Sequence, residues 1–224
     1  KALESYDELV EQARTNMGVR TVLMIPPLMH GAAQWAVFNV VSTGGWIAIP
    51  DHVDHLDAES ALRLAERERV LSIPVVGDAV ARPLLDEIET GKYDLSGLVT
   101  VTNGGAPLSP TVRDRLLAAL PNLMVIDAVG SSESGMQMTT MAAKGIDTAA
   151  ATFTPQGDTS VVAADFTRVL QPGDGEGWLA RRAFVPLGYL GDAEKTARTF
   201  PTIDGVRWSV PGDLATVEAD ASIT

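Results

Sequence analysis

Two stretches of the chain place small polar residues directly after short apolar runs. Residues 123–135 read Leu-Met-Val-Ile-Asp-Ala-Val and then Gly-Ser-Ser-Glu-Ser-Gly, and residues 102–109 read Thr-Asn-Gly-Gly-Ala-Pro-Leu-Ser. Short apolar runs fill buried parallel strands, and ligands of open α/β sheets bind just beyond the carboxyl ends of such strands. The two stretches are therefore the first candidates for a ligand site.

The first stretch offers hydroxyl groups and one carboxylate. Ser131 and Ser132 are hydroxyl donors suited to a phosphate, and Glu133 carries the hard oxygen that Mg²⁺ prefers. The alternative is a plain strand-to-helix turn, with serine as a cap, glycine at positive φ, and Glu133 solvated at the positive end of a helix dipole. Taken alone, the stretch fits that turn slightly better.

The second stretch offers backbone with little bulk. Gly104, Gly105 and Ala106 would let a flat base approach the main chain closely. The alternative is a tight turn before a helix that Ser109 caps, with Pro110 in its first position. A small loop at the end of a strand serves either purpose.

Four short motifs follow one another along the chain. They are residues 27–30 (Pro-Leu-Met-His), 104–108 (Gly-Gly-Ala-Pro-Leu), 129–133 (Val-Gly-Ser-Ser-Glu) and 210–213 (Val-Pro-Gly-Asp). Together they resemble the adenylate-forming superfamily, which includes acyl-CoA synthetases, luciferases and peptide-synthetase adenylation domains. The sequences of residues 177–182 and 188–196 most resemble those of bacterial acyl-CoA ligases for fatty acids or sterol side chains. The resemblance runs from residue 21 to the end of the chain.

The resemblance implies roles on the nucleotide side of a site. Glu133 would hold Mg²⁺ against the ATP phosphates, Ser132 with Ser131 would contact the α-phosphate, and Asp213 would accept hydrogen bonds from the ribose hydroxyls. Without the other motifs, Asp213 would be an ordinary residue of a type II turn formed by Pro211-Gly212. The remaining nucleotide-binding positions implied by the family are Gly104, Gly105, Ala106, Asp127, Val129 and Gly130. Val129 stands where the family has an aromatic that stacks on adenine.

Two further residues are implied on the acyl side. The resemblance makes His30 a wall of the acyl pocket near the reacting carboxylate, although a lone histidine is more often structural. The Trp35 side chain either lines the acyl pocket or lies in the hydrophobic core, and the core is the better expectation for a tryptophan in an apolar helix.

The implied reaction has two steps and uses ATP, Mg²⁺ and CoA. A fatty or other hydrophobic carboxylate attacks the α-phosphate to give acyl-adenylate and pyrophosphate, and the CoA thiol then displaces AMP. Catalysis would consist mainly of positioning and charge neutralisation. The alternatives are a fatty-acyl-AMP ligase that loads a carrier protein and a non-catalytic nucleotide-binding module. A nucleotide-binding oxidoreductase is disfavoured because no Gly-x-Gly-x-x-Gly follows the first predicted strand.

Strand and helix patterns alternate through the first 135 residues, which predicts an α/β fold with a mostly parallel sheet and covering helices. Strands are expected at 21–25, 46–49, 71–76, 98–102 and 124–127, and helices at 2–15, 31–43, 58–69, 77–89 and from 109 onward. The helix at 31–43 is expected to be mostly buried, with Trp35, Val37, Phe38, Val40 and Val41. Asp57 is expected to cap the next helix.

Residues 136–224 show short β-prone pieces separated by Gly, Pro and Asp, at 151–153, 160–164, 177–180, 207–210 and 215–218. They predict a β-rich subdomain, a distorted barrel, in the same N-terminal domain as the α/β subdomain of residues 1–135. By the resemblance, a phosphate loop would precede residue 1 and a C-terminal domain with a catalytic lysine would follow residue 224. The 224 residues alone are then expected to be inactive.

Composition excludes several classes of function. The net charge is −12 and the 17 basic residues are scattered, which argues against a nucleic-acid surface. The chain has no cysteine, so disulfide and thiolate chemistry are excluded. No run approaches the ~18 apolar residues that span a bilayer, and no charged-then-apolar leader opens the chain, so a cytoplasmic protein is expected.

One cluster has the residue types of a metal site, namely Asp51-His52-Val53-Asp54-His55. It lies in a polar stretch between Pro50 and the expected cap Asp57, and the resemblance gives it no role. An ordinary surface loop is therefore the better expectation.

Overall fold

The computed structural model describes residues 5–16, 20–145 and 153–224. The chain divides into two compact units, Lys1–Asp127 with Met141–Asp147, and Ala128–Thr140 with Thr148–Thr224. The division falls inside the fifth strand of the chain.

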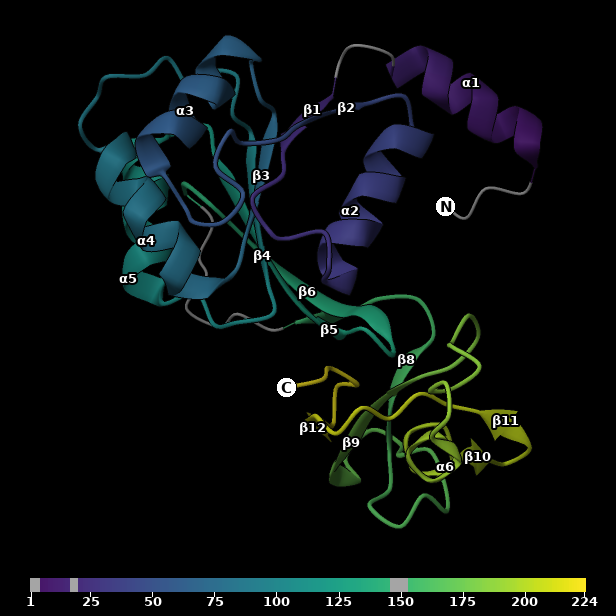
Figure 1. Cartoon of the computed structure of the whole chain (residues 1–224). Coiled ribbons are helices and arrows are strands. Elements are labelled where there is room, and N and C mark those ends of the chain that lie inside the picture. Colours follow the sequence, from purple (N-terminus) through teal and green to yellow (C-terminus); the bar gives the residue numbers. More distant parts are fainter. Residues whose placement is uncertain (1–4, 17–19, 146–152) are drawn as a thin grey trace. The chain divides into compact units, whose positions relative to one another are not determined.

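The first unit alternates strands and helices, as its sequence predicts (Figure 1). Its helices are α1 (Tyr6–Asn16), α2 (Gly31–Ser42), α3 (Ala58–Arg67), α4 (Gly77–Ile88) and α5 (Pro110–Ala119). Its strands are β1 (Thr21–Leu23), β2 (Trp46–Ala48), β3 (Ser72–Val75), β4 (Thr100–Gly104) and the first part of β5 (Met124–Ser131).

The sheet has seven strands in the order β2-β1-β3-β4-β5-β6-β7, where β6 is Gly135–Ala143 and β7 is Thr154–Pro155. Strand β1 pairs in parallel with β2 and β3, and β3 pairs in parallel with β4. Strand β7 pairs antiparallel with β6. The predicted α/β fold with a mostly parallel sheet is confirmed.

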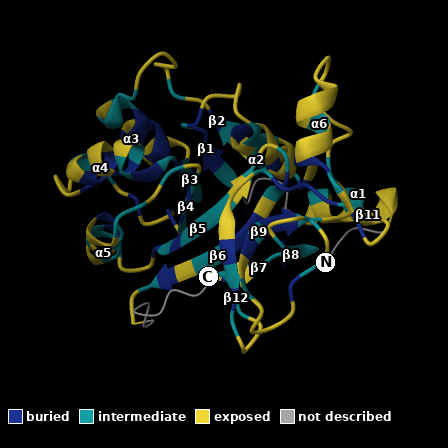
Figure 2. Ribbon diagram, turned by 90° about the horizontal axis from the view of Figure 1, so that it is seen from below, coloured by how far each residue is buried: buried dark blue, intermediate teal, exposed yellow. Residues whose placement is uncertain are grey.

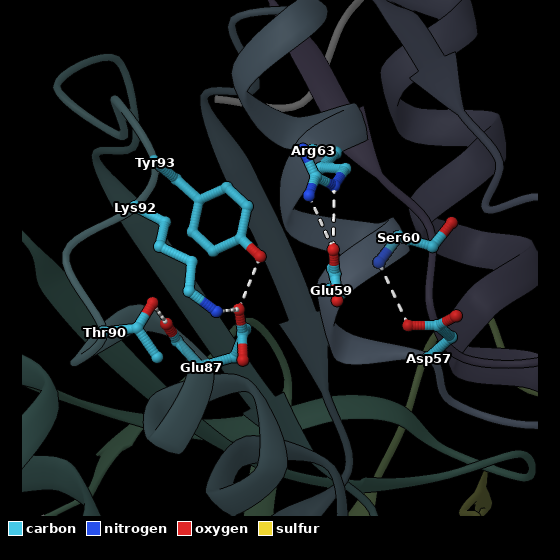
Figure 3. Close-up of polar contacts among 8 residues, drawn as sticks. All are labelled: Asp57, Glu59, Ser60, Arg63, Glu87, Thr90, Lys92 and Tyr93. Atoms are coloured by element: carbon cyan, nitrogen blue, oxygen red, sulfur yellow. Dashed lines mark hydrogen bonds and ion pairs between the residues drawn. The ribbon is translucent and has the colours of Figure 1, made fainter.

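The main core of the first unit lies between the sheet and the helices α3, α4 and α5, which cover one of its faces (Figure 1). The inner sides of α3 and α4 bury Leu62, Leu64, Leu84 and Leu85, and α5 adds Val112 and Leu116. Two of these helices begin at the predicted caps. The Asp57 carboxylate accepts the Ser60 N–H at 3.0 Å, and the Ser109 hydroxyl accepts the Val112 N–H at 3.3 Å. Figure 3 shows the first of these caps.

Helix α2 lies on the other face of the sheet, and its predicted burial is wrong. Only Ala33 and Val40 are buried in it, whereas Trp35 is 41% exposed, Phe38 71% and Val41 58%. The helix is apolar around most of its circumference, so packing one side against the sheet leaves other apolar side chains uncovered by the described residues. Periodicity could not show which side would be covered.

The second unit is rich in short strands, as predicted. Strands β8 (Thr159–Val162), β9 (Gly175–Arg181) and β12 (Leu214–Val217) form an antiparallel sheet in the order β12-β9-β8. Strands β10 (Thr202–Ile203) and β11 (Val206–Arg207) form a separate ribbon, so the described strands make a sheet and a ribbon where one distorted barrel was expected. The expected strand at 151–153 lies mostly outside the described residues.

One helix of the second unit was not predicted. Helix α6 (Ala193–Thr199) begins at Asp192, whose carboxylate accepts the Lys195 N–H at 2.8 Å. Its outer side is exposed, as Figure 2 shows in yellow, and Thr199 is its buried end. None of the helices in the described residues is long and apolar enough to cross a membrane.

Candidate functional site

The Ser-Ser-Glu-Ser segment is a tight turn between two strands. Strand β5 continues through Ser131 and β6 begins at Gly135, so no helix follows Glu133. Neighbouring strands joined by so short a link must be antiparallel, because a parallel pair needs a long crossover. The alternative interpretation of this stretch as a strand-to-helix turn, with a helix dipole that favours Glu133, is therefore wrong.

Gly130 allows the two strands to approach at the base of this turn. A Cβ on Gly130 would lie 2.3 Å from the Gly135 carbonyl oxygen, and Gly135 itself has a φ of +71°. Only glycine meets both demands at low cost, the first by lacking a side chain and the second by tolerating left-handed backbone. Gly130 and Gly135 thus each have a conformational reason to be glycine in this strand–turn–strand arrangement.

Hydrogen bonds within the turn hold its backbone. The hydroxyls of Ser131 and Ser134 lie 2.9 Å apart, and the Ser134 hydroxyl donates to Gln137 Oε1 at 2.7 Å. Arg181 Nη1 donates to the carbonyls of Ser134 and Met136 at 2.9 and 3.0 Å. Ser134 and Gln137 are buried, whereas Ser132 is exposed at the tip. The result is a fixed turn that presents Ser132 and Glu133.

The Glu133 carboxylate is partly buried and hydrogen-bonded. The Tyr189 hydroxyl donates to Glu133 Oε1 at 2.5 Å, and the Ser209 hydroxyl donates to the Glu133 main-chain carbonyl at 2.8 Å. The bond from Tyr189 holds the pKa of Glu133 below its usual value, against the opposing effect of burial, with smaller contributions from Ser131 and Lys195. Glu133 is therefore a carboxylate anion at neutral pH.

Residues in α6 and directly after it hold Tyr189 in place. Its main-chain N–H donates to the Thr196 hydroxyl at 2.9 Å, and its ring lies 5.8 Å from that of Phe200, centroid to centroid. The Lys195 ammonium lies 3.9 Å from the ring centroid, at cation–π distance. Burial and then Glu133 raise the pKa of the Tyr189 phenol, so it stays a donor. The motif match covers Tyr189 but did not identify this contact.

Asp213 follows the predicted turn. Gly212 has a φ of +115°, in the region that glycine favours, and Pro211 precedes it. The Asp213 carbonyl accepts the Leu179 N–H at 2.8 Å, which ties the residue to β9, and its side chain is exposed. The backbone of Asp213 is thus anchored while its carboxylate is open to solvent. Its role toward a ribose stays a prediction.

In the first unit, Asn103 organises the glycine loop. Its Oδ1 accepts the Gly77 N–H at 2.7 Å, and its Nδ2 donates to the Ala106 carbonyl at 2.9 Å and to Asp127 Oδ1 at 2.7 Å. Asn103 is only 1% exposed, so its amide is buried and needs these partners. The structure thereby brings Ala106 and Asp127, two of the predicted site residues, to one buried amide.

Asp78 fixes the far end of the same loop. Its Oδ1 accepts the Ser109 N–H at 2.8 Å, and its own N–H donates to the Pro107 carbonyl at 3.3 Å. The backbone and then the side chain of Ser109 lower the pKa of Asp78. Gly105 has a φ of +78° and is exposed in the middle of the loop. Neither Asn103 nor Asp78 was singled out from the sequence, because their partners lie far away along the chain.

The remaining predicted residues have simpler surroundings. His30 precedes α2, is exposed, and makes no side-chain capping bond. Val129 is partly buried and packs against the core of the second unit around Met138 and Val161. Valine at this position therefore contributes to packing within its own unit.

The available donors fit the groups that the motifs imply. The turn offers a carboxylate and hydroxyls, which are hard oxygen ligands of the kind Mg²⁺ takes alongside phosphate oxygens. In the surroundings described here, neither Glu133 nor Ser132 contacts an imidazole that would favour a softer metal. Glu133 is the residue that would hold Mg²⁺.

The sequence matches the AMP-binding enzyme family over residues 3–190. It is 52% identical over 220 residues to the medium-chain acyl-CoA ligase Mig of Mycobacterium avium, covering 98% of this chain and 40% of that protein. It is 38% identical over 208 residues to the 3-oxocholest-4-en-26-oate–CoA ligase of Rhodococcus rhodochrous, covering 89% and 37%. The long-chain-fatty-acid-CoA ligase FadD1 of Archaeoglobus fulgidus shares the fold, with a TM-score of 0.75, 17% identity, and coverage of 96% of this chain and 45% of that one.

Proposed function

Because the chain belongs to the AMP-binding enzyme family, we propose that the whole protein activates a fatty or other hydrophobic carboxylic acid with ATP and transfers the acyl group to CoA. The observation that carries the proposal is the 52% identity to a medium-chain acyl-CoA ligase over 98% of the chain. The chain spans about two-fifths of that relative, so its activity and substrates are inferred for the whole protein.

The first step proposed is adenylation. A carboxylate oxygen of the acid attacks the α-phosphorus of ATP, the α–β bridging bond breaks, and pyrophosphate leaves. Because both substrates are anions, the step depends on charge neutralisation and alignment, for which Mg²⁺ bound to phosphate oxygens supplies positive charge. In the second step the CoA thiol attacks the acyl carbon and AMP leaves.

The residues of this chain would bind and orient the nucleotide. Glu133 would hold the metal, and Ser131 and Ser132 would donate hydrogen bonds to the α-phosphate. Asp213 would accept the ribose hydroxyls, and the loop at Gly104–Ala106, with Asp127, Val129 and Gly130, would lie toward adenine. His30, with Trp35, would line the acyl side. No side chain serves as a nucleophile, because the substrate carboxylate is the nucleophile.

The proposal is tested by pyrophosphate release from the full-length protein with ATP, Mg²⁺ and a panel of fatty acids and sterol side-chain acids. Release should depend on the acid, and AMP should accumulate with acyl-CoA once CoA is added. Acyl transfer to a carrier protein in place of CoA would identify the alternative ligase. A cytoplasmic location also stays a prediction.

The role of Glu133 has its own test. Glu133→Gln keeps the shape of the side chain and removes its charge, so adenylation should fall by roughly a hundredfold or more, while thioester formation from supplied acyl-adenylate should fall far less. Equal loss of both half-reactions would show that the variant is misfolded or that Glu133 has no metal role. Acid-independent pyrophosphate release would overturn the proposed function itself.

A further inference from the structure

Three side chains of the loop between β2 and α3 come together. His52, Asp54 and His55 each offer one ligand atom, and these three atoms lie within 4.8 Å of one another. All three side chains are exposed, so a dissolved ion reaches them without any rearrangement of the core. The loop belongs to the first unit and contains none of the residues assigned to nucleotide or acyl binding.

The spacing of one nitrogen and one oxygen atom in this cluster suits a single ion. His55 Nδ1 lies 3.1 Å from Asp54 Oδ1. Two ligands of a tetrahedral ion at about 2.0–2.1 Å are separated by roughly 3.3 Å, so this pair needs almost no movement to share one metal. The His52 and His55 rings lie 5.0 Å apart, centroid to centroid, and are tilted by 35°. The second imidazole is therefore close enough to reach the same ion by a small movement of an exposed loop.

Asp57 provides a fixed carboxylate beside His52. Its Oδ2 lies 3.8 Å from His52 Nε2, while its Oδ1 accepts the Ser60 N–H at the start of α3, as Figure 3 shows. At 3.8 Å this carboxylate is beyond hydrogen-bond distance of the ring nitrogen, but a small movement of the exposed His52 ring would let it accept the ring N–H and orient the imidazole, as carboxylates do for metal-binding histidines. The cap at Asp57 also anchors one end of the loop to α3.

The donor set selects the class of ion. Two imidazoles with one carboxylate suit Zn²⁺ and similar borderline divalent ions, whereas Mg²⁺ and Ca²⁺ prefer oxygen ligands alone. Asp51, Asp54 and Asp57 make the loop locally acidic, which also favours a cation.

We propose that His52, Asp54 and His55 bind one borderline divalent cation of the Zn²⁺ type, with water completing the coordination. The ion joins three side chains of the loop beside the first turn of α3. This site is separate from the proposed adenylation chemistry and does not depend on it.

The test is calorimetric titration of the chain with Zn²⁺, after treatment with a chelator and with no histidine tag present. One saturable site is expected, and Mg²⁺ at the same concentrations should give no heat from it. Titration with Co²⁺ should produce visible absorption bands typical of a bound ion with nitrogen and oxygen ligands. Absence of saturable Zn²⁺ binding would overturn the proposal.

Matched variants locate the site. His52→Ala and His55→Ala should each weaken Zn²⁺ binding by at least about tenfold, the loss that even an outer partner of a ligand causes. His30→Ala, which removes the third and last histidine of the chain, should leave binding unchanged. Asp54→Asn should weaken binding more than Asp51→Asn, although both remove one negative charge. The assignment would be overturned if His30→Ala weakened Zn²⁺ binding as much as His52→Ala or His55→Ala does. It would also be overturned if Asp51→Asn weakened binding as much as Asp54→Asn does.

Discussion

The same hydrogen bond, from a tyrosine hydroxyl to glutamate Oε1 at 2.5 Å, occurs in both units. Tyr189 makes it to Glu133, and Tyr93 makes it to Glu87, which also pairs with Lys92 at 3.3 Å (Figure 3). In each pair the bond is the largest influence that lowers the pKa of the carboxyl. Burial, with a further contribution from Glu87, raises the pKa of Tyr93 to about 12. The two pairs differ in their surroundings, because only Glu133 lies in the predicted site.

The phenol of Tyr189 should contribute to the acid limit of adenylation. Tyr189→Phe removes the bond that favours the charged carboxylate, so the pKa of Glu133 rises and its charge is lost at a higher pH during acidification. The acidic limb of pyrophosphate release should therefore move to higher pH, with a smaller change at neutral pH. The measurement is the pH profile of the full-length enzyme at saturating ATP.

Tyr93→Phe is the matched control, because it removes the same hydroxyl from the other pair. It should leave the acidic limb where it is, even if it lowers stability. The role of Tyr189 is contradicted if both variants shift the profile alike or if neither does.

Asp213 should recognise the ribose of ATP by accepting hydrogen bonds from its hydroxyls. A hydrogen bond to a charged group contributes about 1.5–3 kcal/mol, so Asp213→Ala should weaken the use of ATP by about ten- to a hundredfold. The unmodified enzyme should disfavour ATP that lacks the 2′ or 3′ hydroxyl, and the variant should lose most of that preference. The measurement is the ratio of kcat/KM for ATP to that for 2′-deoxy-ATP in both proteins. An unchanged ratio would leave Asp213 as a turn residue only.

At the scale of elements, the glycine loop after β4 is packed against the start of α4. Gly77 has a φ of +57°, and a Cβ there would lie 2.8 Å from both the Ala106 Cβ and the Pro107 carbonyl oxygen. Gly91 has a φ of +69°, but a Cβ there would meet nothing within 4 Å. The two glycines thus share a backbone conformation and differ in the contact with the loop.

Gly77→Ala should therefore destabilise the chain more than Gly91→Ala. Both substitutions pay about 1–2 kcal/mol for left-handed backbone, and Gly77→Ala adds about 1–3 kcal/mol because the new methyl group overpacks the loop. Urea unfolding of the two variants measures the difference in the free energy of unfolding. Equal losses would show that the loop moves aside freely and is not held against α4.

Local signals in the sequence predicted most of the elements. Asp57 and Ser109 cap the helices that they were expected to cap, and the strands of the first unit lie within a few residues of their predicted positions. The outward face of α2 was mispredicted because apolar residues lie all around it, and the periodicity of a helix does not show which side a neighbour covers. Helix α6 was missed because it is only seven residues long.

The sequence singled out candidate site residues but not the contacts that these residues make. Glu133, Ser132 and Asp213 were singled out because they stand in short motifs with turn-forming neighbours. The bond from Tyr189 to Glu133 joins residues 56 positions apart, and Asn103 meets Asp127 across 24. Nothing local in the sequence records such pairings, since they are set by the sheet order and by the packing of α6.

At the scale of the whole molecule, each unit carries part of the proposed chemistry. The first holds the loop around Gly105 with Asn103 and Asp127, and the second holds the turn at Glu133 together with Asp213. The net charge of −12 means that an anionic nucleotide gains little from the overall field of this chain. In the proposed function, ATP would therefore be bound through backbone N–H groups, hydroxyls and a metal ion.

The central claim, that the acid attacks the α-phosphorus of ATP, is tested most directly by isotope transfer. The full-length protein is given a fatty acid labelled with heavy oxygen in its carboxyl group, together with ATP, Mg²⁺ and CoA. Attack at the α-phosphorus and release of AMP by the thiol must leave one labelled oxygen in AMP, with pyrophosphate unlabelled, and this is the predicted result. Formation of ADP with the label in inorganic phosphate would mean attack at the γ-phosphorus and would contradict the account.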